Sequence, residues 1–262
     1  MRIIPYGRQS IDKIDKSLVL DTLSNDLITT GPYVKKFEIQ LSKYLKCKYS
    51  YACSSGTAAI HLAMLSINLK KGDIVLMPAV NFIASFNLAK IMQLKVYLVD
   101  VDVYTGQVTP DTILQCIKRH KLKNIKALIV MYHGGYPDNP KGFYDLKKEY
   151  NFFIIEDACH ALGAEYEYKR NFFKVGSCKH ADVSTFSLHP LKASSISTKS
   201  CSRSTAPVRS DPLLACLWTA MSIPNANSLT CKVSYHPFTC SMAWDPFSPG
   251  GGRGWLALIS PS

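Results

Sequence analysis

Apolar residues recur with a helical period over the first part of the chain. Between residues 10 and 47 their spacing is close to 3.6, which predicts an amphipathic helix from about residue 10. The pair Gly31-Pro32 interrupts this pattern before a second predicted helix at 34–45. A third, strongly apolar helix is predicted at 58–67. The first quarter of the chain is therefore expected to be mainly helical.

From residue 73 onward, short apolar runs alternate with amphipathic stretches. The pattern predicts strands at 73–77, 95–100, 127–131 and 152–157, and helices at 82–92, 109–120 and 143–150. Such alternation is typical of an α/β domain with a mostly parallel sheet, in which functional residues lie at the carboxyl ends of the strands. The sequence shows no internal repeat.

The alternation stops after Lys192. Residues 193–262 contain no glutamate, since the last one is Glu167, but they hold all three tryptophans and half of the 14 prolines. A low-complexity linker is one explanation, although three tryptophans and four of the nine cysteines fit it poorly. We therefore expect a domain at 1–192 followed by an aberrant, poorly ordered tail at 193–262, as a frameshift or rearrangement would leave.

The composition is that of a globular protein with a basic charge. Of the 262 residues, 47% are hydrophobic, and the net charge of +12 could indicate a polyanionic partner. The basic residues are mixed with acidic ones, however, and a run such as 118–123 is more typical of a solvated helix end. A phosphorylated small molecule would also suit the charge. We expect no nucleic-acid partner.

Membrane, secretion and metal signals are weak. No stretch approaches the roughly 18 apolar residues of a membrane span, and the first residues lack a signal-peptide core. We therefore expect a cytoplasmic protein without a membrane partner, in which the cysteines stay reduced. Their odd number and irregular spacing fit neither a disulfide framework nor a zinc site, so no metal is expected.

Two segments have residues suited to binding a phosphorylated cofactor. Ser55-Gly56-Thr57-Ala58 opens a predicted helix, and the N–H groups of a helix N-terminus bind phosphate; plain capping of the helix is the alternative. Asp157 ends a predicted strand, where its carboxylate could pair with a protonated ring nitrogen. It could equally cap the next helix.

The other candidates lie near these segments or shortly after them. Lys192, in a mostly apolar loop, could form a Schiff base, and Ser187 could bind phosphate; a surface lysine is the alternative. His160, close to Asp157, could be catalytic or purely structural.

The order of these features resembles that of fold type I pyridoxal-phosphate enzymes. Residues 1–192 resemble the DegT-type nucleotide-sugar aminotransferases, in particular those that aminate C4 of UDP-4-keto-6-deoxy-N-acetylhexosamines in pseudaminic acid synthesis. The resemblance implies the fold type I large domain, a mostly parallel sheet between helices, with the C-terminal small domain missing. Five ordered segments carry it: 27–32 with Phe37-Glu38, 54–61, 78–87, 156–166 and 184–192.

The resemblance also implies roles for individual residues, with pyridoxal 5′-phosphate as the cofactor. Lys192 would form the Schiff base and shuttle a proton, and Asp157 would keep the pyridinium protonated. His160 stands where the family places a group near the phenolic oxygen, often glutamine. The remaining cofactor residues would be Gly56, Thr57, Ala58 and Ser187 at the phosphate and Phe82 against the ring, with Thr30, Gly31 and His133 toward the sugar nucleotide.

The implied activity is amino transfer, with glutamate as the expected donor, to C4 of a UDP-4-keto-6-deoxy sugar for surface-glycan synthesis by a homodimer. A family branch that removes a hydroxyl has histidine at the lysine position, so Lys192 favours transamination. The family normally continues with a Glu-Gly-Gly turn and a small domain, where this chain has Ala193–Lys199. The alternative is an inactive remnant that at most binds cofactor or a partner.

Overall fold

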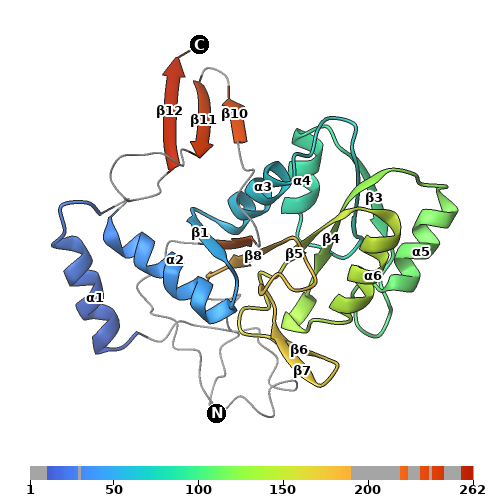
Figure 1. Cartoon of the computed structure of the whole chain (residues 1–262), viewed down its shortest axis with the longest axis horizontal. Helices are drawn as coiled ribbons and strands as arrows, with labels where there is room; N and C mark the ends of the chain where they lie inside the picture. Colours follow the sequence, from blue (N-terminus) through green and yellow to red (C-terminus); the bar gives the residue numbers. More distant parts are fainter. Residues whose placement is uncertain are drawn as a thin grey trace, which may run out of the picture.

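The computed structural model describes residues 11–28 and 31–189, together with the backbone of four later strands. Thr30 and Lys192, which the sequence assigns to the site, lie outside the described residues. Figure 1 shows a body of helices around a sheet, with a smaller sheet beside it. The predicted α/β architecture is confirmed for the body.

Six helices are described before residue 190. Their bounds are α1 Lys13–Leu23, α2 Pro32–Leu45, α3 Gly56–Ser66, α4 Ala84–Ile91, α5 Pro110–Arg119 and α6 Pro140–Tyr150, and a short 3₁₀ turn, η1, spans His133–Gly135. Most differ from their predicted ranges by one or two residues at each end. Helix α6 begins three residues earlier than predicted, because the Asn139 side chain accepts the Gly142 N–H at 2.9 Å and Pro140 suits a first helical position.

Twelve strands are described. Their bounds are β1 Tyr49–Cys53, β2 Ile74–Pro78, β3 Lys95–Val99, β4 Ile125–Met131, β5 Phe153–Asp157, β6 Glu165–Tyr168, β7 Asn171–Lys174, β8 Val183–Ser187, β9 Thr219–Ile223, β10 Cys231–Tyr235, β11 Phe238–Trp244 and β12 Trp255–Pro261. The four predicted strands correspond to β2, β3, β4 and β5. Strand β8 escaped prediction because its centre, Ser184-Thr185, is polar although fully buried.

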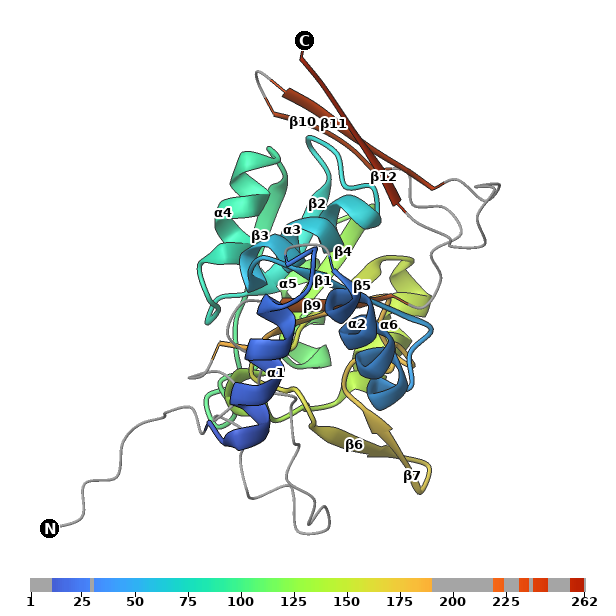
Figure 2. The same ribbon diagram turned by 90° about the vertical axis from the view of Figure 1, so that its left-hand side faces the viewer.

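The main sheet has seven strands in the order β1-β9-β8-β5-β4-β2-β3. All neighbours in the run from β8 to β3 are parallel, whereas β9 is antiparallel to both β1 and β8. Strands β10, β11 and β12 form a separate antiparallel sheet, and β6 and β7 form a hairpin that projects from the body (Figures 1 and 2).

The strand β9 was not expected from the sequence. Its backbone fills the place between β1 and β8, with Met221 opposite both Tyr51 and Thr185. Residues 193–262 were expected to form a poorly ordered tail; within this segment the structure describes β9, which pairs with β1 on one side and β8 on the other. The apolar patch around Met221 is compatible with such a position. The proposed domain boundary at residue 192 stays a prediction.

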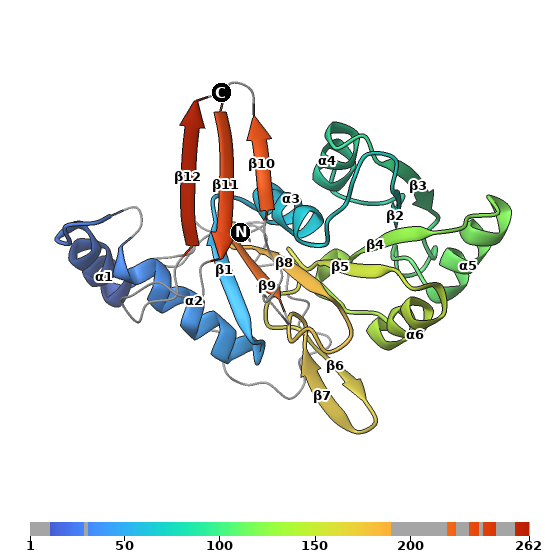
Figure 3. The same cartoon turned by 45° about the horizontal axis from the view of Figure 1, so that its top comes forward.

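Helices cover both faces of the sheet (Figure 3). One core cluster joins α2, α5 and α6 to side chains such as Leu128 and Ile154, and the other joins α3 and α4 to Ile129 and Ile155. Adjacent residues of a strand point to opposite faces, which explains why neighbours divide between the two clusters. Whether a residue at the end of a strand faces one helix layer or the other therefore follows from the alternation of side chains along that strand.

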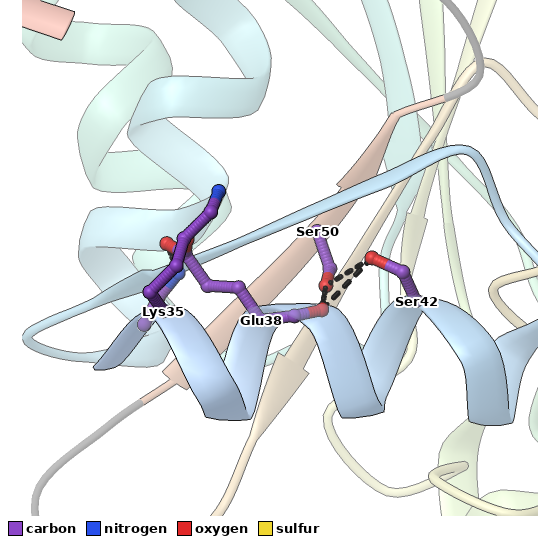
Figure 4. A network of polar contacts seen from close by, with 5 residues as sticks. Lys35, Glu38, Ser42 and Ser50 are labelled. Carbon is purple, nitrogen blue, oxygen red and sulfur yellow. Dashed lines mark hydrogen bonds and ion pairs between the residues drawn. The ribbon is translucent and has the colours of Figure 1, made fainter. Parts of the chain in front are cut away.

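Helix α2 covers the outer edge of β1 through a polar network (Figure 4). The Glu38 carboxylate accepts the Ala52 N–H at 3.1 Å and lies 3.6 Å from the Lys35 ammonium. The Glu38 carbonyl oxygen accepts hydrogen bonds from the hydroxyls of Ser42 and Ser50 at 2.8 and 2.5 Å. An edge strand with open N–H groups can pair with other chains, so this network protects the sheet edge.

Candidate functional site

Asp157 lies at the carboxyl end of β5, on the face of the sheet that α3 covers. Ile155, two residues earlier in β5, packs in the same core cluster as Ile60 of α3. Because side chains alternate along a strand, Asp157 lies on the same face as Ile155. The residue is only 1% exposed, and its Oδ1 accepts the Cys159 N–H at 3.2 Å. A buried carboxylate at this edge is positioned for a cationic partner.

The N-terminus of α3 approaches the ends of β5 and β8. A Cβ atom on Gly56 would lie 3.4 Å from Cys159 Sγ and 3.5 Å from Ser187 Cβ, so these three residues are in close contact. Since Cys159 also donates to Asp157, one short chain of contacts joins Gly56, Ser187 and Asp157. The structure therefore brings together three of the predicted cofactor residues.

The first turn of α3 is both capped by a side chain and suited to binding a phosphate, the two interpretations that the sequence left open. The Ser55 hydroxyl oxygen caps it by accepting the Ala58 N–H at 3.2 Å, so the capping interpretation is confirmed for Ser55. Thr57 is exposed on the same turn. The uncapped N–H groups and the helix dipole remain suited to a phosphate. Ser187 Oγ, which accepts the His189 N–H at 3.4 Å, lies beside this turn.

Two histidines meet at the ends of β4 and β5. His133 begins η1, directly after β4, and His160 follows β5; their ring centroids are 5.8 Å apart and the rings are tilted by 48°. The Gly134 N–H donates to His160 Nδ1 at 3.4 Å. The sequence assigned His160 to the cofactor and His133 to the sugar nucleotide, and the structure makes them direct neighbours.

A buried carboxylate, Glu156, ties these strand ends together from the opposite face. Its Oε1 accepts the Tyr132 hydroxyl at 2.7 Å, and its Oε2 accepts the Ser184 hydroxyl. Burial raises the pKa of Glu156, and the hydrogen bonds from Ser184 and Tyr132 offset part of that effect. Because Tyr132 also donates its N–H to the Asp157 carbonyl at 3.3 Å, the network holds β4 and β5 in register beside the site.

Phe82 and Gly31 are less directly connected to this cluster. Phe82 lies in the loop between β2 and α4, at the same edge of the sheet, and is 51% exposed. Gly31 caps α2, where a Cβ atom would lie 1.9 Å from the Leu27 carbonyl oxygen, so only glycine fits. The described contacts of Gly31 thus account for its role at the start of α2. Thr30 and Lys192 are outside the described residues.

The sequence analysis missed three polar residues near the site. Cys159 links Asp157 to Gly56, as described above. In the loop after β2, both amide atoms of Asn81 are buried without a hydrogen-bond partner among the described residues, and so is the hydroxyl of Ser85 one turn further on. An asparagine three residues beyond a strand end is a signal that could have been used. Buried polar atoms of this kind are normally satisfied, so a bound group is one explanation.

These residues fit a planar, phosphorylated pyridine cofactor. A buried carboxylate suits a protonated ring nitrogen, a close-approaching glycine at a helix N-terminus suits a phosphate, and the Asn81 amide offers both a donor and an acceptor. Within the described part of the chain, no group of three or more residues could hold a metal ion. No helix there is long and apolar enough to cross a membrane.

Comparison with known proteins gives consistent matches. The model of the DegT/DnrJ/EryC1/StrS aminotransferase family matches residues 9–197. The UDP-4-amino-4,6-dideoxy-N-acetyl-beta-L-altrosamine transaminase of Campylobacter jejuni is 34% identical over 190 residues, which are 72% of this chain and 48% of that protein. The chain spans about half the length of the curated relatives it matches.

Solved structures share the fold. The PLP-form of the putative sugar aminotransferase Spr1654 from Streptococcus pneumoniae has a TM-score of 0.67 at 22% identity, covering 86% of this chain and 54% of that one. Helicobacter pylori PseC, an aminotransferase involved in the biosynthesis of pseudoaminic acid, has a TM-score of 0.68 at 20% identity, covering 85% and 52%. These matches confirm the predicted fold class. With the family match over residues 9–197, they lead to one conclusion: the chain belongs to the DegT/DnrJ/EryC1/StrS aminotransferase family.

Proposed function

We propose that residues 1–192 form the large, cofactor-binding domain of a nucleotide-sugar aminotransferase that uses pyridoxal 5′-phosphate. The observation that carries this proposal is the contact chain from buried Asp157 through Cys159 to Gly56 and Ser187. It gathers a partner for a ring nitrogen and a phosphate-binding turn at one edge of the sheet, as the family requires.

Each residue in this site has a distinct task. Asp157, shielded from water, holds a proton on the ring nitrogen by charge pairing. The first-turn N–H groups of α3, from Gly56 to Ala58, and the hydroxyls of Thr57 and Ser187 bind the phosphate. The bound cofactor supplies an electron sink for the donor's α-carbon. Lys192 moves the proton at that carbon.

The finer substrate assignment rests on the similar proteins. The Campylobacter jejuni relative is named as a transaminase of a UDP-linked 4-amino-4,6-dideoxy sugar. We therefore propose that the acceptor is a UDP-4-keto-6-deoxy sugar aminated at C4, that glutamate is the donor, and that the product serves surface-glycan synthesis. Gly31 with Thr30 and His133 would face the sugar nucleotide, Phe82 would stack on the pyridine ring, and a homodimer would be the working unit.

A second candidate is a remnant that binds cofactor without turning over substrate. The observation that favours it is the coverage, since the matched residues make up only 46–49% of the curated relatives. In this case the site on the large domain would be intact, but the parts that complete it in longer proteins would have to come from elsewhere.

Cofactor binding and turnover separate these candidates. Purified protein is mixed with pyridoxal 5′-phosphate, and the visible absorption of the bound cofactor is recorded for the wild type, for Lys192→Ala and for the control Lys179→Ala, an exposed lysine. We expect the absorption band of the Schiff base in the wild type and the control but not in Lys192→Ala, where the cofactor can bind only without a covalent bond. Amino transfer from glutamate to a 4-keto sugar nucleotide then supports the enzyme, whereas a band without turnover supports the remnant. A wild type that binds no cofactor contradicts the enzyme and leaves the remnant without a cofactor site.

A further inference from the structure

The histidine pair at the ends of β4 and β5 has a feature that the site description does not use. The Gly134 N–H donates to Nδ1 of His160, at 3.4 Å. A backbone N–H can only donate, so the nitrogen that accepts it must have its lone pair available. In a neutral imidazole one nitrogen carries the proton and the other accepts. The ring proton of His160 therefore belongs on Nε2.

The turn that provides this N–H, η1, is held in place by the residue that precedes it. Tyr132, the residue before η1, donates its hydroxyl to Glu156 Oε1 at 2.7 Å and its N–H to the Asp157 carbonyl at 3.3 Å. Tyr132 is buried, so these bonds are protected from water. The position of the Gly134 N–H is thus set by the same buried network that aligns β4 with β5.

Glycine is needed at position 134 because of its backbone conformation. Its φ is +69°, in the left-handed region, and a Cβ atom there would have open space around it. The left-handed conformation is unfavourable for a residue with a Cβ, and β-branched residues tolerate it least. The requirement is therefore on the backbone and not on packing, which makes substitution a clean test.

We propose that the Gly134 N–H is a positioning group that locks His160 as a neutral imidazole with its proton on Nε2, so that this histidine donates a hydrogen bond to the ring oxygen of the bound cofactor. This inference rests on the proposed function for the identity of the acceptor. The tautomer itself does not depend on it. The ring of His133 is the direct neighbour of this ring, with the two centroids 5.8 Å apart.

The proposal explains how histidine can occupy a place where a glutamine side chain would serve. Glutamine always carries an N–H donor on its amide, whereas histidine presents a donor on a given nitrogen only in one of its two neutral tautomers. Without the Gly134 N–H, the proton could move to Nδ1, and Nε2 would become an acceptor facing an acceptor. Gly134 thus takes part in specificity for the cofactor.

The tautomer can be measured directly in the cofactor-free protein. Long-range ¹H–¹⁵N correlation spectra of the imidazoles distinguish protonated from unprotonated ring nitrogens, and His160→Gln assigns the His160 signals by their loss. We expect His160 to be protonated on Nε2 alone. Gly134→Val, which disfavours the left-handed turn, should introduce the Nδ1-protonated form. Gly134→Asn, which tolerates a positive φ, should retain the wild-type tautomer.

A matched control isolates the effect of position. Gly72 also has a positive φ, +88°, and open space at its Cβ position. Gly72→Val therefore imposes a comparable backbone cost away from η1, and it should leave the His160 spectrum unchanged. Cofactor affinity is measured on the same set. Gly134→Val should weaken it by up to about tenfold, the effect of one hydrogen bond, whereas the control should leave it unchanged.

The outcomes divide clearly. A wild-type His160 that is protonated on Nδ1, or a spectrum that Gly134→Val leaves unaltered, overturns the inference even if the protein binds cofactor. An Nε2-protonated His160 that responds to Gly134→Val, in a protein without any cofactor binding, supports the lock and contradicts the proposed function. The spectra therefore test the tautomer of His160, and the binding data test the proposed function, independently of each other.

Discussion

Glu156 and Asp157 are adjacent carboxylates with opposite surroundings. Asp157 lies on the α3 face, at the candidate site, and Glu156 lies on the other face among the hydroxyls of Tyr132 and Ser184. Both are almost fully buried. Because side chains alternate between the two faces of the sheet, Asp157 faces the candidate cofactor site and Glu156 faces the packed core on the other side.

The raised pKa of Glu156 predicts how stability depends on pH. Because burial disfavours the charged form, the folded protein holds this proton more tightly than the unfolded chain does. The stabilisation is complete below the ordinary glutamate pKa of 4.5 and is lost as pH rises through the raised value. We therefore expect Glu156→Gln to gain stability relative to the wild type as pH increases over this range.

Urea denaturation at a series of pH values measures this difference. Glu167→Gln, at an exposed position of β6, controls for the loss of one carboxylate. If instead Glu156→Gln loses stability relative to the wild type as pH rises, the folded protein stabilises the charged carboxylate, contrary to the expectation.

Gly176 is required by both backbone and packing. Its φ is +87°, and a Cβ atom would lie 2.5 Å from Phe186 Cζ. Gly72 has nearly the same φ, +88°, with nothing within 4 Å. We expect Gly176→Ala to lower the free energy of unfolding by roughly 2–5 kcal/mol and Gly72→Ala by only about 1–2 kcal/mol. Equal losses in urea denaturation would mean that the Phe186 contact relaxes.

Sequence reasoning identified the individual site residues better than their connections. Asp157, Gly56 and Ser187 could be proposed from strand ends and a helix start, and the structure joins them. The link through Cys159 and the pairing of His133 with His160 depend on three-dimensional proximity of separate loops. No local pattern encodes such proximity. Their catalytic roles stay predictions.

At the scale of elements, the periodic segments were predicted well and the polar strands were not. Strands β2 to β5 are apolar runs, so the sequence revealed them. Strand β8 has a serine and threonine centre whose hydroxyls find partners on Glu156 only after the sheet forms. Strand β1 depends on pairing with a distant segment. Tertiary context decides such elements.

The cover that α2 places over β1 leads to a second test. Replacing Glu38 by alanine leaves the Ala52 N–H without its carboxylate, and we expect a loss of about 1–3 kcal/mol in unfolding free energy. Glu38→Gln keeps an acceptor oxygen and should remain close to the wild type. Amide hydrogen exchange at Ala52 should accelerate in the alanine variant alone. Equal exchange in both variants would argue against the sealing role.

The position of β9 can be tested with proline. Met221 lies at the centre of β9, between β1 and β8, and proline in a central strand removes a ladder hydrogen bond. We expect Met221→Pro to increase amide exchange in both neighbouring strands. Met242→Pro, in the separate sheet, is the control and should not affect them. No effect of Met221→Pro would favour the poorly ordered tail that the sequence predicted.

At the scale of the whole molecule, one group of exposed apolar side chains lies around α1. Side chains more than half exposed lie on this helix and just after it: Ile14, Leu20, Leu23, Leu27 and Ile28. The helix lies at the left-hand margin of the body in Figure 1. Apolar patches of this kind usually mark an interface, and a second copy of the chain is the partner we proposed.

Charged substitutions on α1 should therefore change the oligomeric state. We expect the wild type to be dimeric by light scattering and Leu20→Glu/Leu23→Glu to be monomeric at the same concentration, because a buried unpaired charge opposes association. The double variant Ile91→Glu/Leu98→Glu alters two equally exposed positions elsewhere and should stay dimeric. A monomeric wild type would contradict the prediction.

The sheet order also has a consequence for the time course of folding. Strand β1 is synthesised before all other strands of the main sheet, whereas β9, which joins it to β8, is synthesised after all of them. Contacts so distant in sequence form slowly, and a strand edge that waits for its partner is prone to aggregation. The segment from β2 to β8 can assemble first, because its paired strands are closer in sequence than β1 is to β9. We infer that β1 is the last strand to enter the sheet, with α2 shielding its outer edge meanwhile.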